Sequence, residues 1–359
     1  MRASIGTTGS DQIPDYGYLN TYSLTSYPYN GSPGLLLTRL YNSDYSWEKN
    51  KKIELGLELG FLHNKIMFYT NWYRNRSSNQ LVGYSLPVIT GQSSIQFNFP
   101  AVVENKGWEF ELNCRPLTTT HFKWSTGFNI SFPQNKLVDY PGLASSPYAN
   151  TFVVGQPLSI KKNYHYTGVD AKTGLYTFQD FDNNGSITFP NDLSALKKIT
   201  QQYYGGFQNS FSFQNFQLSF FLQFVKQTGY NYQQYFSLTG SANNQPIYAL
   251  NRWQNAGDAA INQQYSQNFG SAAAANFFKN QSSDNTIQDA SFMRLKNLSL
   301  SYDLPDKCLK KLHMRLLRIY IRGQNLVTIT NYQGSDPENQ NPQKLPALRV
   351  LSAGISFSL

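Results

Sequence analysis

The stretch KKIELGLELGF, residues 51–61, carries the pattern that decides the fold. Its large apolar side chains all fall on one parity, and small or acidic residues fill the other. The apolar set is Ile53, Leu55, Leu57, Leu59 and Phe61, and the opposite set is Glu54, Gly56, Glu58 and Gly60. Because a β-strand sends alternate side chains to opposite faces, this stretch is predicted to be a strand with one apolar and one polar face.

The same alternation recurs from one end of the chain to the other. GWEFELN (107–113), FKWSTGFNISF (122–132) and the closing LSAGISFSL (351–359) all repeat it. Residues 3–7 already alternate, so we expect the chain to begin inside a strand and to be a fragment of a longer protein. We count about ten strands of a length that suits a membrane barrel, which predicts an all-β, antiparallel fold.

The composition narrows the functional classes. Aromatic residues make up 15% of the chain and charged residues 14%, below the usual value of about 25% for the charged class. No apolar run approaches the roughly 18 residues of a transmembrane helix, whereas a barrel strand needs only about ten alternating residues. The net charge is +9, but the basic residues are dispersed among the strands, so nucleic-acid binding is not predicted. The four histidines are scattered and no catalytic motif occurs, so no enzyme is predicted.

The connections between the predicted strands alternate between short and long. The short links are residues 62–65, 115–121, 214–216 and 306–314. The long links are residues 10–50, 77–101, 136–203, 229–289 and 332–346. Short turns on one side and long loops on the other are typical of an outer-membrane β-barrel with periplasmic turns and extracellular loops. The alternatives are a soluble, aromatic-rich β protein that binds carbohydrate, whose strands would also alternate, and, third, a barrel enzyme of the outer membrane.

Several stretches together resemble one family. They are WEKNKKIELGLELGFLHNKI (47–66), VVENKGWEFEL (102–112), DFDNNGSIT (180–188), SFMRLKNLSLSYDLP (291–305) and LRIYIRGQNLVTITNYQGSDPE (317–338). In this order they resemble the C-terminal part of the SusC/RagA-like TonB-dependent outer-membrane transporters. The matches reach nearly from end to end, and their specificity comes from the set as a whole.

This resemblance implies a transmembrane barrel of 22 strands around an internal plug, located in the cell outer membrane. Residues 1–359 would form about the last ten strands, with the plug domain, the TonB box and the signal peptide absent. The family imports oligosaccharides or peptides with a SusD-like lipoprotein, is energised by the TonB complex through the plug half, and is folded by the barrel-insertion machinery. In the terminal strand, Gly354, Phe357 and Leu359 resemble the insertion signal, although Leu359 replaces the more usual aromatic residue.

A candidate metal site lies in DFDNNGSIT. Asp180, Asp182 and Asn184 alternate before Gly185, as the first ligands of a calcium loop do. The loop's final bidentate glutamate is missing, because Asn191 occupies its place and Asp192 follows. The sequence therefore allows Ca²⁺ bound by Asp180, Asp182, Asn184 and Asp192, or an acidic turn that binds no ion.

A candidate substrate-binding surface lies in the long loop 229–289. Aromatic rings stack on sugars or peptides, and neighbouring amides satisfy their polar groups. The candidates are Tyr230, Tyr232, Tyr235, Tyr248 and Trp253. The alternative is that these rings pack within the loop or against the lipoprotein.

Overall fold

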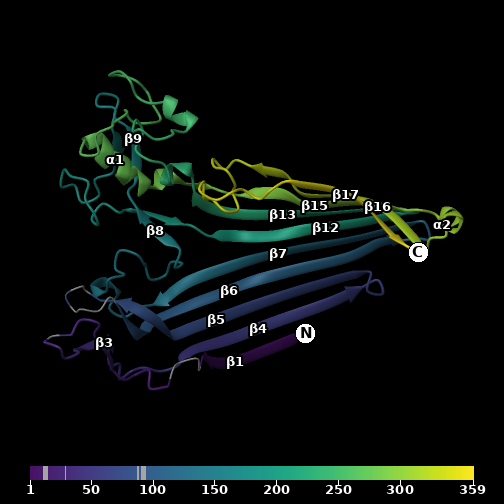
Figure 1. The fold of residues 1–359 in the computed structure, drawn as a ribbon, viewed down its shortest axis with the longest axis horizontal. Coiled ribbons are helices and arrows are strands. Elements are labelled where there is room, and N and C mark those ends of the chain that lie inside the picture. The colour runs from purple at the N-terminus through teal and green to yellow at the C-terminus, as the bar shows by residue number, and fades with distance from the viewer. Residues whose placement is uncertain (11–14, 29, 87–88, 90–93) are drawn as a thin grey trace. The chain divides into compact units, whose positions relative to one another are not determined.

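The structure is a computed structural model that describes residues 1–359 except 11–14, 29, 87–88 and 90–93 (Figure 1). Ten strands follow one another in a single order, β1-β4-β5-β6-β7-β12-β13-β15-β16-β17, and β14 pairs with β13. The registers from β1–β4 and from β7 to β17 are antiparallel, which confirms the predicted fold class. The sheet strands are β1 (Arg2–Ser10), β4 (Glu48–Phe61), β5 (Ile66–Ser85), β6 (Ser94–Thr118), β7 (Phe122–Asp139), β12 (Gln201–Phe213), β13 (Phe216–Tyr230), β14 (Ile287–Asp289), β15 (Phe292–Asp303), β16 (Leu316–Thr330) and β17 (Val350–Ser358).

The chain divides into two compact units. The first comprises Met1–Leu57, Asn71–Trp108 and Gln134–Leu158, and the second comprises Glu58–Thr70, Glu109–Pro133 and Ser159–Leu359. Each unit has a buried apolar cluster of its own. That of the first unit consists of Phe99, Ala101, Val103, Leu137 and Tyr140.

The short connections follow the sequence prediction with two differences. The β4–β5 turn occupies residues 62–65, where Leu62, His63 and Asn64 all have positive φ. β6 runs on to Thr118, so the turn predicted at 115–121 shortens to 119–121. The link between β15 and β16 contains a helix, α2 (Asp306–Leu312), which starts after Pro305 and ends at His313 in the left-handed conformation.

The long connections contain secondary structure that the alternation does not predict. They hold the pairs β2 (Thr21–Leu24) with β3 (Leu35–Arg39), β8 (Ile160–Asn163) with β11 (Ala195–Lys198), and β9 (Tyr166–Val169) with β10 (Tyr176–Phe178), the helix α1 (Ala272–Gln281), and short 3₁₀ turns at Leu143–Ser145, Tyr232–Gln234, Ile247–Leu250 and Asp284–Thr286. The predicted connection 77–101 is shorter than expected, because β5 reaches Ser85 and β6 begins at Ser94. Residues 87–88 and 90–93 of that connection lie outside the described part of the chain.

The loops of the second unit form an apolar core of their own. α1 and β9 lie together beyond one end of β12 and β13, and α2 lies at the other end (Figure 1). The buried residues of this loop core are Tyr164, Tyr176, Phe178, Leu238, Ala274 and Phe277. Ser271 caps α1, because its side chain accepts a hydrogen bond from the Ala274 N–H. The loops between these strands are therefore packed rather than extended.

Strand register separates two faces as the alternation predicts. Phe211 faces Trp124 across the β7–β12 pair, with ring centroids 5.7 Å apart, and one residue further Ser210 faces Ser125. Along β16 and β17, Ile319 lies opposite Ile355 while Tyr320 lies opposite Gly354. No helix among the described residues is long and apolar enough to cross a membrane.

Candidate functional site

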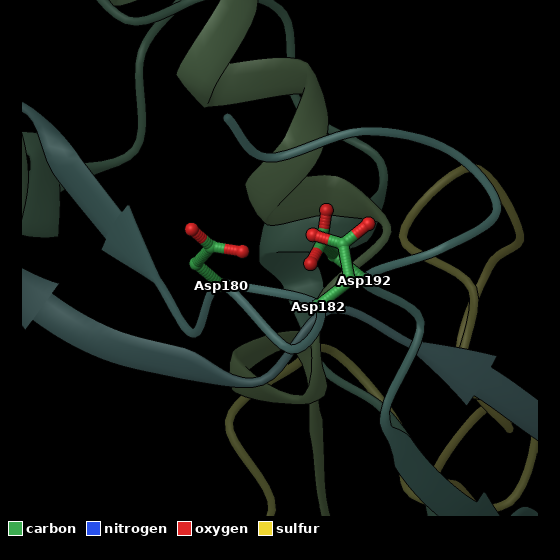
Figure 2. A group of neighbouring side chains, drawn as sticks. All are labelled: Asp180, Asp182 and Asp192. Atoms are coloured by element: carbon green, nitrogen blue, oxygen red, sulfur yellow. The ribbon is translucent and has the colours of Figure 1, made fainter. Parts of the chain in front are cut away.

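The acidic turn between β10 and β11 brings three of the four predicted metal ligands together. One carboxylate oxygen each from Asp180, Asp182 and Asp192 lies within 4.8 Å of the others (Figure 2). The turn closes on Asp180, whose Oδ1 accepts the Asn184 N–H at 3.2 Å and whose Oδ2 accepts the Gly185 N–H at 2.7 Å. Gly185 has a φ of 82°, a conformation that favours glycine.

Asp192 closes this turn from its far end. Its Oδ1 accepts the Phe181 N–H and its Oδ2 accepts the Thr188 N–H, both at 2.7 Å, and its side chain is fully buried. The hydrogen bond from the Thr188 N–H keeps the pKa of Asp192 below its usual value. Burial opposes this effect, and the hydrogen bond from the Phe181 N–H adds to it. Asp192 is therefore ionised at neutral pH. In the sequence it lies one residue after the position at which a calcium loop places its last ligand.

The donor set fits a hard cation such as Ca²⁺. Among the described residues, no lysine, arginine or histidine forms a salt bridge with Asp180, Asp182 or Asp192, so the three negative charges are not neutralised by the chain itself. Asn184 is used differently, because its Oδ1 accepts the Ser186 N–H and its Nδ2 donates to Asp182. In this arrangement the carboxylates, rather than the Asn184 amide, are the oxygens that a cation would meet.

The predicted substrate-binding rings are partly buried within their own loop. The rings of Tyr232 and Tyr248 lie 4.5 Å apart between centroids, and Phe236 packs against both. Burial raises the pKa of Tyr232 and of Tyr248. The loop thus holds a compact aromatic cluster.

Trp253 also has a structural position. Its indole Nε1 donates to the Ala171 carbonyl at 2.9 Å, and its ring lies so close to Gly174 that a Cβ there would come within 2.4 Å of it. Tyr230 is the last residue of β13, and its carbonyl accepts a hydrogen bond from Tyr332, while the Tyr235 N–H donates to the Tyr232 carbonyl at 3.1 Å. Of the five predicted rings, the ring contacts that the structure describes join Tyr232 to Tyr248 only.

A polar hollow that the sequence analysis did not single out lies beside the short turns of the second unit. It has a volume of about 570 Å³. Lys65, Tyr69, Asn113, Arg115 and Gln208 are among its lining residues. The sequence offered one signal for this hollow, because Lys65 and Arg115 each lie in a predicted short link. The prediction placed Arg115 in a turn, whereas the structure places it in β6.

A buried ion cluster joins β15 to the connection that follows β16. Arg294 donates from Nη2 to Asp336 Oδ1 at 2.9 Å and from Nη1 to Glu338 Oε2 at 2.6 Å, and Lys296 lies 3.2 Å from Glu338. The side chains of Arg294 and Asp336 are only 3% and 4% exposed. We call Arg294, Lys296, Asp336 and Glu338 the buried ion cluster after the buried Arg294–Asp336 pair, at whose edge the side chains of Lys296 and Glu338 are 32% and 40% exposed. It fixes a loop to the strand rather than offering a free charge.

Two residues of the predicted insertion signal, Gly354 and Phe357, lie in β17, and Leu359 follows the last residue of that strand. Phe357 and Leu359 are exposed, at 62% and 74%. Gly354 is covered by Tyr320, since a Cβ at this position would come within 2.6 Å of the ring. The glycine therefore leaves room for a cross-strand aromatic ring.

Comparison with known proteins identifies relatives along nearly the whole chain. The chain is 31% identical to TonB-dependent receptor P3 of Formosa agariphila over 378 residues, which cover 96% of this chain and 36% of the relative. It is 25% identical to TonB-dependent receptor SusC of Bacteroides thetaiotaomicron over 385 residues, covering 99% and 37%. No family model matches the sequence.

Solved structures agree with these relatives. A chain in the structure of the RagAB peptide transporter superposes with a TM-score of 0.80 at 25% identity, covering 100% of this chain and 40% of that one. A chain of the RagAB peptide importer in an open-open state gives the same TM-score. The chain thus spans a little over a third of the length of the relatives that it matches.

Proposed function

Because the resemblance to the SusC/RagA-like TonB-dependent transporters is confirmed in both sequence and fold, we propose that this chain is the C-terminal part of the barrel wall of an outer-membrane nutrient importer. The observation that carries the proposal is the unbroken order of ten strands with one apolar and one polar face. A lipid-facing apolar side and a polar lumen are what a membrane barrel requires.

The names of the relatives support a proposal for the cargo and the partners. One structural relative is named a peptide transporter and one sequence relative is named SusC, so we propose oligosaccharide or peptide uptake together with a SusD-like lipoprotein. The TonB complex would act through the plug half of the transporter, and the barrel-insertion machinery would read Gly354, Phe357 and Leu359. The relatives are named as receptors and transporters, which supports a role without enzymatic activity.

The test is localisation and uptake of the complete transporter that contains this chain. We expect the protein in the outer-membrane fraction, and we expect deletion of its gene to abolish growth on one class of oligosaccharide or peptide. A matched deletion of the neighbouring lipoprotein gene should lower uptake of the same cargo. A protein that stays in the soluble fraction and binds carbohydrate there would favour the alternative function.

We also propose that Ca²⁺ orders the acidic turn, supported by the proximity of Asp180, Asp182 and Asp192. At a Ca²⁺ concentration ten times the dissociation constant, binding adds about 1.4 kcal/mol to the stability of the state that it orders. Calcium should therefore slow proteolysis between residues 180 and 192, and Asp182→Asn should reduce this protection. Equal cleavage with calcium and with a chelator would contradict the proposal.

A role of the loop aromatics in cargo binding is the remaining proposal. Trp253 packs on Gly174, so Trp253→Ala tests folding as well as binding. Tyr235→Ala is the cleaner variant, because the structure shows no ring contact for Tyr235 among the described residues. Weaker cargo binding with an unchanged melting temperature would support the role, and unchanged binding by both variants would favour loop packing.

A further inference from the structure

The outward face of the first unit changes character along its strands. On β4, Ile53, Leu55 and Leu57 share a parity, and Leu55 and Leu57 are 43% and 38% exposed. Ile5 of β1 lies opposite Ile53 and is 83% exposed. Two residues beyond Ile53, the same face carries the exposed Lys51. An apolar surface is therefore followed by a basic one in the direction of the long loops.

The neighbouring strands repeat this change. On β5, Arg74 and Arg76 follow Trp72 on the same parity, and on β6, Lys106 follows Trp108 when the strand is read in the opposite direction. Trp108 is 49% exposed. Tryptophan at the border between an apolar and a charged surface is typical of the membrane interface. The basic residues are therefore placed at the level of lipid headgroups.

Side-chain contacts bring these basic residues together. Glu104 Oε2 accepts hydrogen bonds from Arg74 Nε at 2.7 Å and from Arg76 Nε at 2.6 Å, and Lys106 Nζ lies 3.9 Å from Glu104 Oε1. The Glu104 side chain is 7% exposed, whereas those of Arg76 and Lys106 are each 42% exposed. One buried carboxylate thus holds three cations in place and leaves an excess of two positive charges.

Two further lysines extend this surface. Gly56 of β4 lies beside Asn71 of β5, because a Cβ on Gly56 would come within 2.9 Å of the Asn71 amide oxygen. In an antiparallel pair with this register, Lys51 lies beside Arg76. Asn135 of β7 donates to Asn105 at 2.7 Å, so the exposed Lys136, next in sequence, lies beside the Glu104 strand segment. We call Lys51, Arg74, Arg76, Lys106 and Lys136 the outer basic patch.

We propose that the outer basic patch binds the phosphate groups of a phosphorylated glycolipid in the outer leaflet. This inference rests on the proposed membrane location. Glu104 engages both arginines through Nε, and the described contacts leave their terminal N–H groups available for the bidentate bonds that guanidinium forms with phosphate. The apolar face beside the patch suits acyl chains, whereas a free phosphate would use only the charges.

The test measures lipid binding by the complete transporter in phosphatidylcholine nanodiscs that contain either lipid A or dephosphorylated lipid A. We expect lipid A to bind more tightly than its dephosphorylated form. The variant Lys51→Gln/Lys136→Gln should lower lipid A affinity about 25-fold, since each interfacial cation contributes about fivefold. These lysines do not contact Glu104 in the described contacts, so this variant keeps the Glu104 ion group intact.

The control is Lys310→Gln/Lys311→Gln, which removes the same charge from exposed positions of α2. It should leave lipid A affinity unchanged. Equal affinity for the two lipids, an equal loss in both variants, or displacement of lipid A by millimolar inorganic phosphate would each overturn the inference. Membrane fractionation of the unmodified protein is scored separately, so an absence from the outer membrane would count against the proposed function instead.

Discussion

The buried ion cluster and the outer basic patch consist of similar charged residues, but they differ in charge balance and in burial. In the buried ion cluster, two cations meet two carboxylates, and Arg294 and Asp336 are almost completely buried. In the outer basic patch, Arg74, Arg76 and Lys106 surround the single carboxylate of Glu104 and remain partly exposed. Charge balance therefore separates an ion group that stabilises the fold from one that is prepared for an external anion.

The largest expected effect comes from breaking the balanced group. Arg294→Ala leaves Asp336 buried without its partner, which should lower the free energy of unfolding of the complete transporter by about 3–5 kcal/mol. Urea unfolding in detergent measures this change. As a control, Arg318→Ala breaks the more exposed pair with Asp303 and should cost about 1 kcal/mol.

A double variant sharpens this prediction. Replacing both partners, in Arg294→Met/Asp336→Leu, removes the unpaired charge and should cost less than Arg294→Ala alone. If the double variant were less stable than Arg294→Ala, the loss of stability would come from packing rather than from an uncompensated carboxylate.

The second effect separates stability from binding in the outer basic patch. Glu104→Gln removes a charged acceptor shared by two arginines, so the free energy of unfolding should fall by about 1.5–3 kcal/mol. The same change raises the net charge of the patch by one and should strengthen lipid A binding. Lower stability together with weaker lipid binding would show that Glu104 mainly orders the arginines for the ligand.

A change in salt concentration should have a smaller effect than these variants, and it should act on the outer basic patch more than on the buried ion cluster. Raising ionic strength from 0.1 to 1 M shortens the screening length from about 10 Å to about 3 Å. Lipid A binding by the exposed patch should weaken, while the destabilisation caused by Arg294→Ala should change little. A binding affinity that does not respond to salt would argue that acyl chains, and not phosphate groups, dominate recognition.

The smallest effect concerns pH. Although burial opposes its ionisation, hydrogen bonds from the Glu338 and Ala347 N–H groups and from Arg294 keep the pKa of Asp336 below its usual value of 3.8. A carboxyl with a lowered native pKa contributes stability above its unfolded pKa and loses it as the pH falls through the native one. Stability should therefore decline below about pH 3.8, and Asp336→Asn should flatten this decline in thermal unfolding curves.

The wall of the fold could be predicted from the sequence because its information is local. Alternation along residues 51–61 and 351–359 fixes which face each side chain takes, and the strands β4 and β17 follow it. The pairs β8–β11 and β9–β10 were not predicted, because their three or four residues are too short for a period to emerge. The strands β9 and β10 are held instead by packing against residues at least 60 positions away, such as Leu238 and Phe277.

The candidate sites divide in the same way. Asp180, Asp182 and Asp192 lie within 13 residues, so their spacing could predict that they meet. Arg74 and Glu104 meet because of strand register, and Arg294 meets Asp336 across a loop. For Arg74 and Glu104 the signal was a charge on the apolar parity of a strand, which says that a partner is needed but not which residue supplies it.

The separate core of the loops has a consequence for how such proteins diversify. Tyr176 and Phe178 pack with Ala274 and Phe277, so residues 160–198 and residues 231–286 complete one another. Recombination that exchanges both segments together would transplant a finished core while the strands between them keep their pairing. Exchange of either segment alone would leave apolar residues of the other without counterparts, so the two are expected to be inherited as one cassette.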